Sequence, residues 1–167
     1  MSVIYLIGFM GVGKTSVGLE LAKKLHYSFY DSDQTVVERT GKSISELFDE
    51  MGEVGFRELE QQALQSLPTE NCIIATGGGI ILKSENRQYM KKNGHVIWLD
   101  ASPTEIGKRL ENDSSRPLLS HNKNEQIEKL YRSRTDLYKQ ASDFHIETDG
   151  KLVTEIIEEI LIKNLKI

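Results

Sequence analysis

One octapeptide near the N-terminus has the residue types that bind a phosphate chain. Residues 8–15 read Gly-Phe-Met-Gly-Val-Gly-Lys-Thr, which has the spacing G-x-x-x-x-G-K-[ST] of a phosphate-binding loop. Its glycines let backbone N–H groups turn toward phosphate oxygens, Lys14 is expected to reach the β and γ phosphates, and the Thr15 hydroxyl is expected to ligate Mg²⁺. The pattern predicts a nucleoside triphosphate site. The expected contacts are Gly11, Val12, Gly13, Lys14, Thr15 and Ser16.

Two aspartates separated by one residue, Asp31 and Asp33, follow the second apolar run of the chain. Carboxylates at alternate positions can offer one group to the water shell of a metal and the other to a substrate hydroxyl, whose proton it accepts during attack on phosphorus. The alternative is that the aspartates cap the following helix. Capping would account for one of them, through Asp33 or the neighbouring Ser32, but hardly for both.

Three consecutive glycines, Gly77, Gly78 and Gly79, follow the third apolar run. Glycine lets a ligand approach main-chain N–H groups closely, at a cost in backbone entropy. Because three in a row would be a costly way to build a turn that is merely flexible, we expect them to line a ligand site.

Two arginines occupy inward positions on predicted helices. At roughly 100° per residue, Arg134 falls in the middle of an apolar face, whereas Arg132 points to the opposite, solvated side. Arg57 lies at the edge of another apolar face and is expected to be half buried. An inward guanidinium needs an anionic partner, and a carboxylate suits its bidentate fork. The two arginines therefore suggest a small anionic ligand, with a structural ion pair beneath the helix as the alternative for Arg134.

A polar segment at about 111–124 is longer than most connections in a compact domain, which suggests a lid or a disordered insert. It contains Arg116 followed by Pro117, a stiffened arginine that a closing loop could bring onto a transferred phosphoryl group. A solvated loop arginine is the alternative.

These residues need elements that bring them together. Short apolar runs alternate with amphipathic stretches of helical length, in β-α-β-α order. The order predicts a three-layer α/β fold of the P-loop NTPase type, with a five-stranded parallel sheet flanked by helices and ligands at the carboxyl ends of the strands. The expected strands are 3–7, 28–30, 72–75, 96–99 and 144–146. The expected helices are 15–26, 35–40, 53–67, 84–92 and 152–165, with further starts after Ser43, after Ser102 and near 125, and with Ser84 as a cap.

Length and composition limit the class of protein. The 167 residues suggest one domain over 1–167, and 21 basic against 25 acidic residues give a net charge of −4, which argues against a general nucleic-acid or membrane binder. The apolar runs are too short for a signal segment or a membrane span, and the single cysteine, Cys72, can form no intramolecular disulfide. We therefore expect a cytoplasmic protein. The charged surface and the absence of an unassigned apolar helix face favour a monomer. The four scattered histidines argue against a histidine or cysteine metal site.

The chain resembles the shikimate kinase family over nearly its whole length. The matching segments are residues 8–15, D-S-D at 31–33, G-E-V-G-F-R-E-L-E at 52–60, T-G-G-G at 76–79, R-P-L-L at 116–119 and R-T-D-L-Y at 134–138. The resemblance implies transfer of the γ-phosphoryl group of ATP to the 3-hydroxyl of shikimate, giving shikimate 3-phosphate and ADP in aromatic amino-acid biosynthesis. It also implies an acceptor-binding segment at about 32–62 and a lid at about 111–124.

The same resemblance implies an acceptor site. Asp33 would bind the ring hydroxyls and orient or deprotonate the nucleophile, while Arg57 and Arg134 would hold the shikimate carboxylate in a pocket lined by residues 77–79. The family often has proline where Asp136 stands here, a departure that leaves Arg134 in place and concerns local backbone shape and substrate affinity.

For the nucleotide, the resemblance implies that Lys14 and Arg116 stabilise the migrating charge. Thr15 would ligate Mg²⁺, and Asp31 would act on that metal through water. Arg109 resembles a family position that stacks on adenine.

Two other functions stay open at this point. Another small-molecule kinase, such as a gluconate or nucleoside monophosphate kinase, would share the phosphate loop, although a nucleotide acceptor should not need Asp33 combined with Arg57 and Arg134. A non-catalytic module would bind ATP only as a conformational ligand, and the presence of Lys14 and Arg116 speaks against it.

Overall fold

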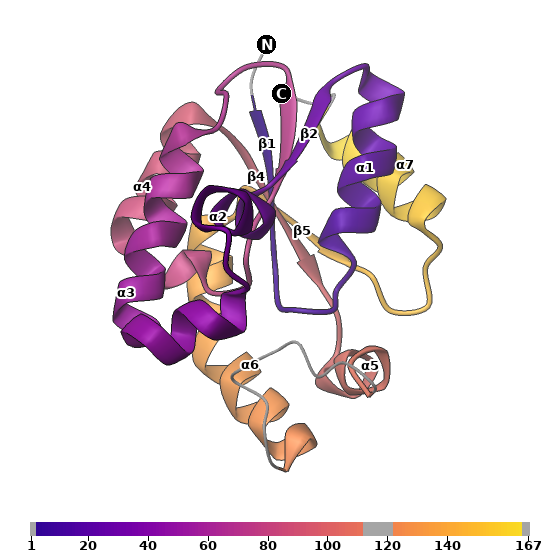
Figure 1. The fold of residues 1–167 in the computed structure, drawn as a ribbon. Coiled ribbons are helices and arrows are strands. Elements are labelled where there is room, and N and C mark those ends of the chain that lie inside the picture. Colours follow the sequence, from indigo (N-terminus) through magenta and orange to yellow (C-terminus); the bar gives the residue numbers. More distant parts are fainter. Residues whose placement is uncertain (1–2, 112–121, 165–167) are drawn as a thin grey trace.

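The computed structural model describes residues 3–111 and 122–164, and a five-stranded sheet lies at their centre (Figure 1). The strands lie in the order β2-β3-β1-β4-β5, and every neighbouring pair is parallel. The prediction of a five-stranded parallel sheet is therefore confirmed. The strands are β1 (Val3–Ile7), β2 (Ser28–Asp31), β3 (Cys72–Ala75), β4 (Gly94–Asp100) and β5 (Phe144–Glu147).

Helices cover both faces of the sheet, which gives the expected three layers. Helices α1 and α7 contact each other on one face, and α4 contacts both α3 and α6 on the other (Figure 1). The helices are α1 (Lys14–Leu25), α2 (Ser32–Thr40), α3 (Ile44–Ser66), α4 (Ser84–Asn93), α5 (Pro103–Arg109), α6 (Lys123–Ala141) and α7 (Val153–Asn164), with a short 3₁₀ turn, η1 (Ile80–Leu82). No helix among residues 3–111 and 122–164 is long and apolar enough to cross a membrane.

The middle of the sheet forms the core and sets the position of the functional segments. Every residue of β1 and β3 is buried, because both faces of these strands are covered by helices. Loop 8–13 follows β1, Asp31 ends β2, and the glycines 77–79 follow β3. Since parallel strands end at the same edge, the topology brings these three segments together.

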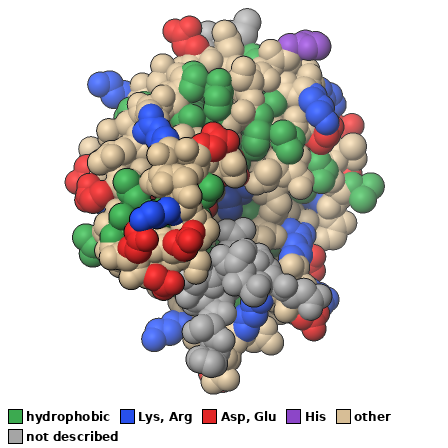
Figure 2. Space-filling view, viewed as in Figure 1, with side chains coloured by type: hydrophobic (Ala, Val, Ile, Leu, Met, Phe, Trp, Pro, Cys, Tyr) green, Lys and Arg blue, Asp and Glu red, His purple; other side chains and the backbone are tan. Residues whose placement is uncertain are grey.

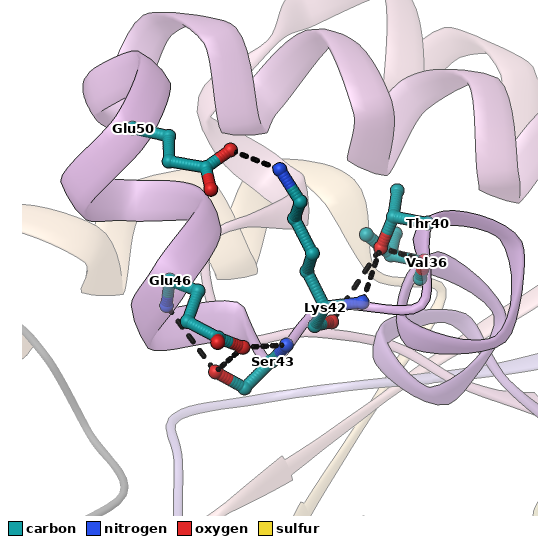
Figure 3. A network of polar contacts seen from close by, with 6 residues as sticks. All are labelled: Val36, Thr40, Lys42, Ser43, Glu46 and Glu50. Carbon is teal, nitrogen blue, oxygen red and sulfur yellow. Dashed lines mark hydrogen bonds and ion pairs between the residues drawn. The ribbon is translucent and has the colours of Figure 1, made fainter.

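The connection from α2 to α3 is fixed by polar contacts at both ends of the turn (Figure 3). Ser43 and Glu46 form a capping box, in which the Glu46 N–H donates to Ser43 Oγ at 3.2 Å and the Ser43 N–H donates to Glu46 Oε2 at 2.7 Å. Lys42 forms an ion pair of 2.5 Å with Glu50 one turn further along α3. These contacts fix where α3 begins and confirm the predicted start after Ser43.

Two predicted helix boundaries were wrong. Helix α2 begins at Ser32 rather than at residue 35, because Asp31 acts as its N-cap. The two helices expected around 44–67 are joined in α3 across a kink at Gly52, whose φ of 70° and ψ of −178° are not helical, so the predicted division just before residue 53 is confirmed. Ser84 is the first residue of α4 and not its cap; the cap position is held by Lys83, whose side chain makes no capping hydrogen bond.

The segment expected to form a lid is only partly described. Residues 112–121, and with them Arg116, lie outside the described residues. The C-terminal limit of 124 was wrong, because Lys123 and Asn124 already belong to the first turn of α6. Helix α6 continues without interruption through Asp136, where the family often has proline.

Candidate active site

The loop between β1 and α1 has the geometry expected of a phosphate-binding loop. Gly11 and Gly13 have positive φ angles of 80° and 95°, which residues other than glycine rarely adopt. The Lys14 ammonium group donates to the carbonyl oxygens of Gly8 and Phe9, both at 2.8 Å, and its side chain lies back over the loop. The loop and the start of α1 thus present backbone N–H groups and a positive charge to one space.

Asp31 connects this loop to β2. The Thr15 hydroxyl donates to Asp31 Oδ2 at 3.1 Å, while Asp31 Oδ1 accepts from the backbone N–H groups of Asp33 at 3.0 Å and Gln34 at 3.1 Å. The capping alternative had named Asp33 or Ser32 as the cap, and that assignment was wrong. Asp31 caps α2 with one oxygen and faces the Thr15 hydroxyl with the other, which leaves Asp33 to point elsewhere.

A first pocket opens along the phosphate loop. Arg109 lies across one side of it, donating through Nη1 to the Val12 carbonyl at 3.2 Å and through Nε to Glu105 at 3.0 Å. The Val12 side chain is buried in the core, so that only its main chain belongs to the loop surface. The predicted residues that line this pocket are Gly11, Gly13, Lys14, Thr15, Ser16, Asp31, Asp33, Gly77, Gly78 and Arg109.

A second pocket adjoins the first and shares five lining residues with it, namely Met10, Asp33, Ile44, Gly77 and Gly78. Its remaining lining combines apolar side chains with charged groups. These residues are Phe48, Phe56, Arg57, Glu60, Gly79 and Arg134. The space-filling view shows a hollow at the centre of this face with basic side chains recessed in it (Figure 2). Asp33 lies at the junction of the two pockets.

Arg57 is held by acidic side chains on its own helix. Its Nη1 contacts Glu60 at 2.9 Å and its Nη2 contacts Glu53 at 3.1 Å. Burial would lower the pKa of Arg57, but these two carboxylates raise it, so the guanidinium stays charged. With 8% of its surface exposed, Arg57 is more deeply buried than the half-buried position predicted from the sequence.

Glu60 is completely buried beside this arginine. Burial, with a smaller contribution from the charge of Asp33, raises the pKa of its carboxyl group to about 7 against the opposing attraction of Arg57. Its Oε2 contacts Arg57, while Oε1 has no hydrogen-bond partner among the described residues. A carboxyl group therefore reaches the wall of the second pocket with one oxygen unbonded.

Arg134 is in a different situation from Arg57. It is 2% exposed, in the middle of the inward face of α6 as predicted, and no described carboxylate lies within ion-pair distance of it. Its guanidinium carbon lies 5.9 Å from the centre of the Phe9 ring. Arg132 is exposed and pairs with Glu128, as its predicted outward position requires. The structural ion pair considered as an alternative for Arg134 is thus absent from the described residues.

Gly77 and Gly79 are required by space and not by backbone angle, because neither has a positive φ. A Cβ atom at Gly77 would lie 2.4 Å from Asp33 Oδ1 and 2.6 Å from Glu60 Oε1. A Cβ atom at Gly79 would lie 2.3 Å from the guanidinium of Arg57. The missing side chains let two carboxylates and an arginine pack directly against the main chain.

Sequence reasoning missed several residues of this site. Glu60 was part of a matching segment but received no role, although it follows Arg57 by three residues and therefore shares its helix face. Phe48 and Phe56, which form the apolar wall, pack against each other in a tilted arrangement with ring centres 4.6 Å apart. Ser32 was considered only as a cap, but its hydroxyl accepts a hydrogen bond from the Gly77 N–H at 3.1 Å.

Comparisons with known proteins agree with this geometry. The family model described as shikimate kinase matches residues 10–164. A shikimate kinase from Bacillus mycoides (strain KBAB4) is 43% identical over 160 residues, which is 96% of this chain and 96% of that protein. The solved structure of a shikimate kinase from Acinetobacter baumannii in complex with shikimate superposes with a TM-score of 0.96 at 36% identity, covering 99% of this chain and 94% of that chain. A gluconokinase from Sinorhizobium meliloti 1021 shares the fold alone, with a TM-score of 0.62 and 14% identity over 99% of this chain and 95% of that chain.

Proposed function

The chain belongs to the shikimate kinase family of ATP-using transferases, and from this premise we propose that it transfers the γ-phosphoryl group of ATP to the 3-hydroxyl of shikimate. The products are shikimate 3-phosphate and ADP. One observation carries the proposal: Asp33 lies where a phosphate-binding pocket meets a second pocket that contains a buried arginine, Arg134, without a carboxylate partner among the described residues. That second pocket fits an acceptor which carries both a carboxylate and hydroxyl groups.

Arg134 and Arg57 hold the acceptor carboxylate in this proposal. A buried guanidinium favours an anion strongly, since little water competes for it and its planar donors fit a carboxylate in a bidentate manner. Arg57 is already paired with Glu60, so its remaining capacity is smaller. Arg134 therefore supplies most of the attraction, and Arg57 directs the carboxylate toward residue 79.

Asp33 acts on the attacking hydroxyl. Its carboxylate orients the 3-hydroxyl toward the phosphate pocket and accepts its proton as the new oxygen–phosphorus bond forms and the bond from the γ phosphorus to the bridging oxygen of ADP breaks. Placement at the junction of the pockets is what this role requires, because the two reacting oxygens must lie on opposite sides of the transferred phosphorus.

The nucleotide is held by residues 11–16. Backbone N–H groups of this loop bind the phosphates, and Lys14 moves from the loop carbonyls onto the β and γ phosphate oxygens. Arg109, on the side of the same pocket, packs against adenine. Arg116 adds a second positive charge to the transferred group; it lies outside the described residues, and its part in the proposal rests on the R-P-L-L segment alone.

A magnesium ion bound with ATP fits the residues present. The Thr15 hydroxyl and the Asp31 carboxylate lie 3.1 Å apart at the edge of the phosphate pocket, and both are oxygen donors of the kind that Mg²⁺ prefers. No cluster of three or more acidic, histidine or cysteine side chains able to hold a metal is found among the described residues. That suits an ion held by one hydroxyl, one carboxylate through water, and phosphate oxygens. When bound, it neutralises charge on the phosphates.

We further propose that the chain is a single kinase domain that acts as a cytoplasmic monomer. Support for the compartment comes from the buried free thiol of Cys72, which suits a reducing environment. A molar mass near 19.0 kDa by light scattering is the expected result, and a stable dimer would contradict it.

Product analysis tests the proposed reaction. The purified protein is incubated with Mg²⁺, ATP and shikimate, and the products are examined by ³¹P NMR and mass spectrometry. We expect one new phosphomonoester, coupled to the proton on C3 of the shikimate ring, and an equal amount of ADP. Phosphorylation at another hydroxyl would overturn the placement of the acceptor, and no phosphorylated product would overturn the proposed function.

A further inference from the structure

Each of the three carbonyl oxygens of Gly77, Gly78 and Gly79 accepts a hydrogen bond from another part of the protein. The Gly77 oxygen accepts from the Ile80 N–H at 3.1 Å and the Gly79 oxygen from the Leu82 N–H at 3.0 Å, bonds that close the 3₁₀ turn η1. The Gly78 oxygen, between them, accepts from the Tyr138 hydroxyl at 2.5 Å. That third bond comes from α6, which lies sixty residues further along the chain.

The N–H groups of the same three glycines are not all hydrogen-bonded within the described residues. The Gly77 N–H donates to Ser32 Oγ, whereas the N–H groups of Gly78 and Gly79 donate to no other described residue. Both residues line the second pocket. The wall of this pocket therefore contains two backbone N–H groups that are free of protein acceptors among the described residues. The carbonyl group of each of their peptides is held by a hydrogen bond, from the Ile80 N–H and the Tyr138 hydroxyl respectively.

Glycine on both sides makes the Gly78–Gly79 peptide easy to rotate. Glycine adopts many combinations of φ and ψ, so this peptide plane can turn over at low cost unless something holds it. In a trans peptide the C=O and N–H bonds point in opposite directions. A hydrogen bond to the Gly78 carbonyl consequently also fixes the direction of the Gly79 N–H.

Tyr138 is well suited to hold this peptide. Its side chain is buried, its ring stacks on Trp98 with centres 5.8 Å apart, and it follows Arg134 by one turn of α6. Burial raises the pKa of the Tyr138 phenol above its ordinary value, although the Arg134 charge partly opposes that shift. The hydroxyl therefore remains protonated and able to donate at neutral pH.

We propose that Tyr138 is a positioning residue for acceptor binding, whose hydroxyl fixes the Gly78–Gly79 peptide so that the backbone N–H group of Gly79 stays directed at an oxygen atom of the acceptor. The neighbouring Gly78 N–H belongs to the preceding peptide, whose carbonyl group is held by the Ile80 N–H. The inference rests on the proposed function, because it takes the second pocket as the acceptor site. It assigns to one α6 residue the task of aligning a main-chain donor in the β3–α4 connection.

The test compares Tyr138→Phe with Tyr131→Phe in steady-state assays. Tyr138→Phe keeps the ring but removes the hydroxyl, and we expect KM for shikimate to rise roughly tenfold while KM for ATP and kcat change by less than about twofold. Tyr131 is the matched control, since it lies on the same helix and its hydroxyl donates to Asp100 at 3.0 Å, away from the glycines. Tyr131→Phe should leave KM for shikimate unchanged.

A second measurement uses the unaltered protein and is independent of how the variant folds. In ¹⁵N-labelled wild-type protein, the backbone amide signals of Gly78 and Gly79 are followed during titration with shikimate. We expect both to shift on binding and their hydrogen exchange to slow. Unchanged amides, or a Tyr138→Phe variant whose KM for shikimate equals that of wild type, would overturn the inference.

The same assays separate two other outcomes, a general structural role of Tyr138 and a failure of the proposed function. If Tyr138→Phe raised KM for ATP as much as KM for shikimate, its role would be general and structural, and the inference would be wrong. If wild-type protein neither bound nor phosphorylated shikimate, the proposed function itself would fail, whatever the variant did.

Discussion

Arg57 and Glu60 lie three residues apart on α3 and form a buried ion pair, with 2.9 Å between Nη1 and Oε2. This pair fixes the guanidinium of Arg57 against the main chain at Gly79. Arg134 enters the same pocket from α6 without a carboxylate among the described residues. The two arginines are thus prepared differently: one is held in place before the acceptor arrives, and the other is available to be neutralised by it.

Removing the charge of Arg134 should weaken acceptor binding most. We expect Arg134→Ala to raise KM for shikimate by roughly a hundredfold, the effect of losing a buried charge-assisted contact worth ~3 kcal/mol, with a smaller change in KM for ATP. Arg132→Ala on the exposed face of the same helix is the control and should match wild type. Equal effects of the two substitutions on KM for shikimate would show that Arg134 does not contact the acceptor.

A methyl group at residue 79 should disturb the acceptor site through Arg57. The Cβ of Gly79→Ala would lie 2.3 Å from the guanidinium, so the arginine must leave its position or the main chain must shift. We expect the KM for shikimate to increase at least tenfold. Gly107→Ala on α5 is a suitable control, because its Cβ would meet only the end of the Asn124 side chain, at 3.1 Å. Wild-type kinetics in Gly79→Ala would contradict the packing described for Arg57.

Asp33→Asn tests the proton acceptor. The amide keeps the size of the side chain and can still bind a hydroxyl, but it cannot take up the proton, so kcat should fall by about 10³-fold. KM for ATP should stay close to the wild-type value. The measurement is ADP release at saturating shikimate, with circular dichroism as a check of the fold. A rate near that of wild type would remove Asp33 from this role.

Glu60 should make stability depend on pH. Its pKa in the folded protein is raised from 4.5 to about 7, chiefly by burial, so folding favours the protonated form. The resulting stabilisation is complete below pH 4.5 and is lost as the pH rises through 7. Between these values the free energy of unfolding of wild type should fall by up to ~1 kcal/mol per pH unit more than that of Glu60→Gln. Urea unfolding at several pH values measures it; parallel curves for the two proteins would refute the assignment.

Much of the fold followed from local sequence patterns. The strands 3–7 and 72–75 were predicted at the residues observed, because continuous apolar runs between helical stretches are typical of parallel strands covered on both faces. The start of α3 followed from its capping box. The phosphate loop needed only its own spacing, since its binding groups are mostly backbone.

The boundaries that were wrong depended on contacts between distant segments or on a choice between neighbours. Asp31 and Asp33 are equally good capping residues by type. Asp31 is the one that caps α2, and its side chain also accepts a hydrogen bond from Thr15 on α1, a contact between distant segments. Strand β4 begins two residues earlier than predicted because Gly94 pairs with Val3 of β1.

In the candidate site, too, the residues that follow from a local sequence pattern could be predicted, and those that depend on tertiary contacts could not. Arg134 could be placed by helical periodicity, which also separated it from Arg132. Glu60 and Tyr138 could not be assigned a role, because each acts through a contact with the glycine segment after β3 that only the tertiary structure reveals. The need for glycine at residues 77 and 79 has the same origin, since it arises from the side chains that pack against them.

The most direct test of the account is acceptor-dependent ADP release by the purified protein with Mg²⁺ and ATP. Parallel reactions contain no acceptor, shikimate, gluconate or AMP. The proposed function predicts rapid release with shikimate alone, and release close to the acceptor-free rate in the other three reactions. Release supported by gluconate or AMP and not by shikimate would contradict the assignment of Arg57 and Arg134 to the shikimate carboxylate, and the absence of any acceptor-dependent release would leave a module that binds ATP without transferring its phosphoryl group.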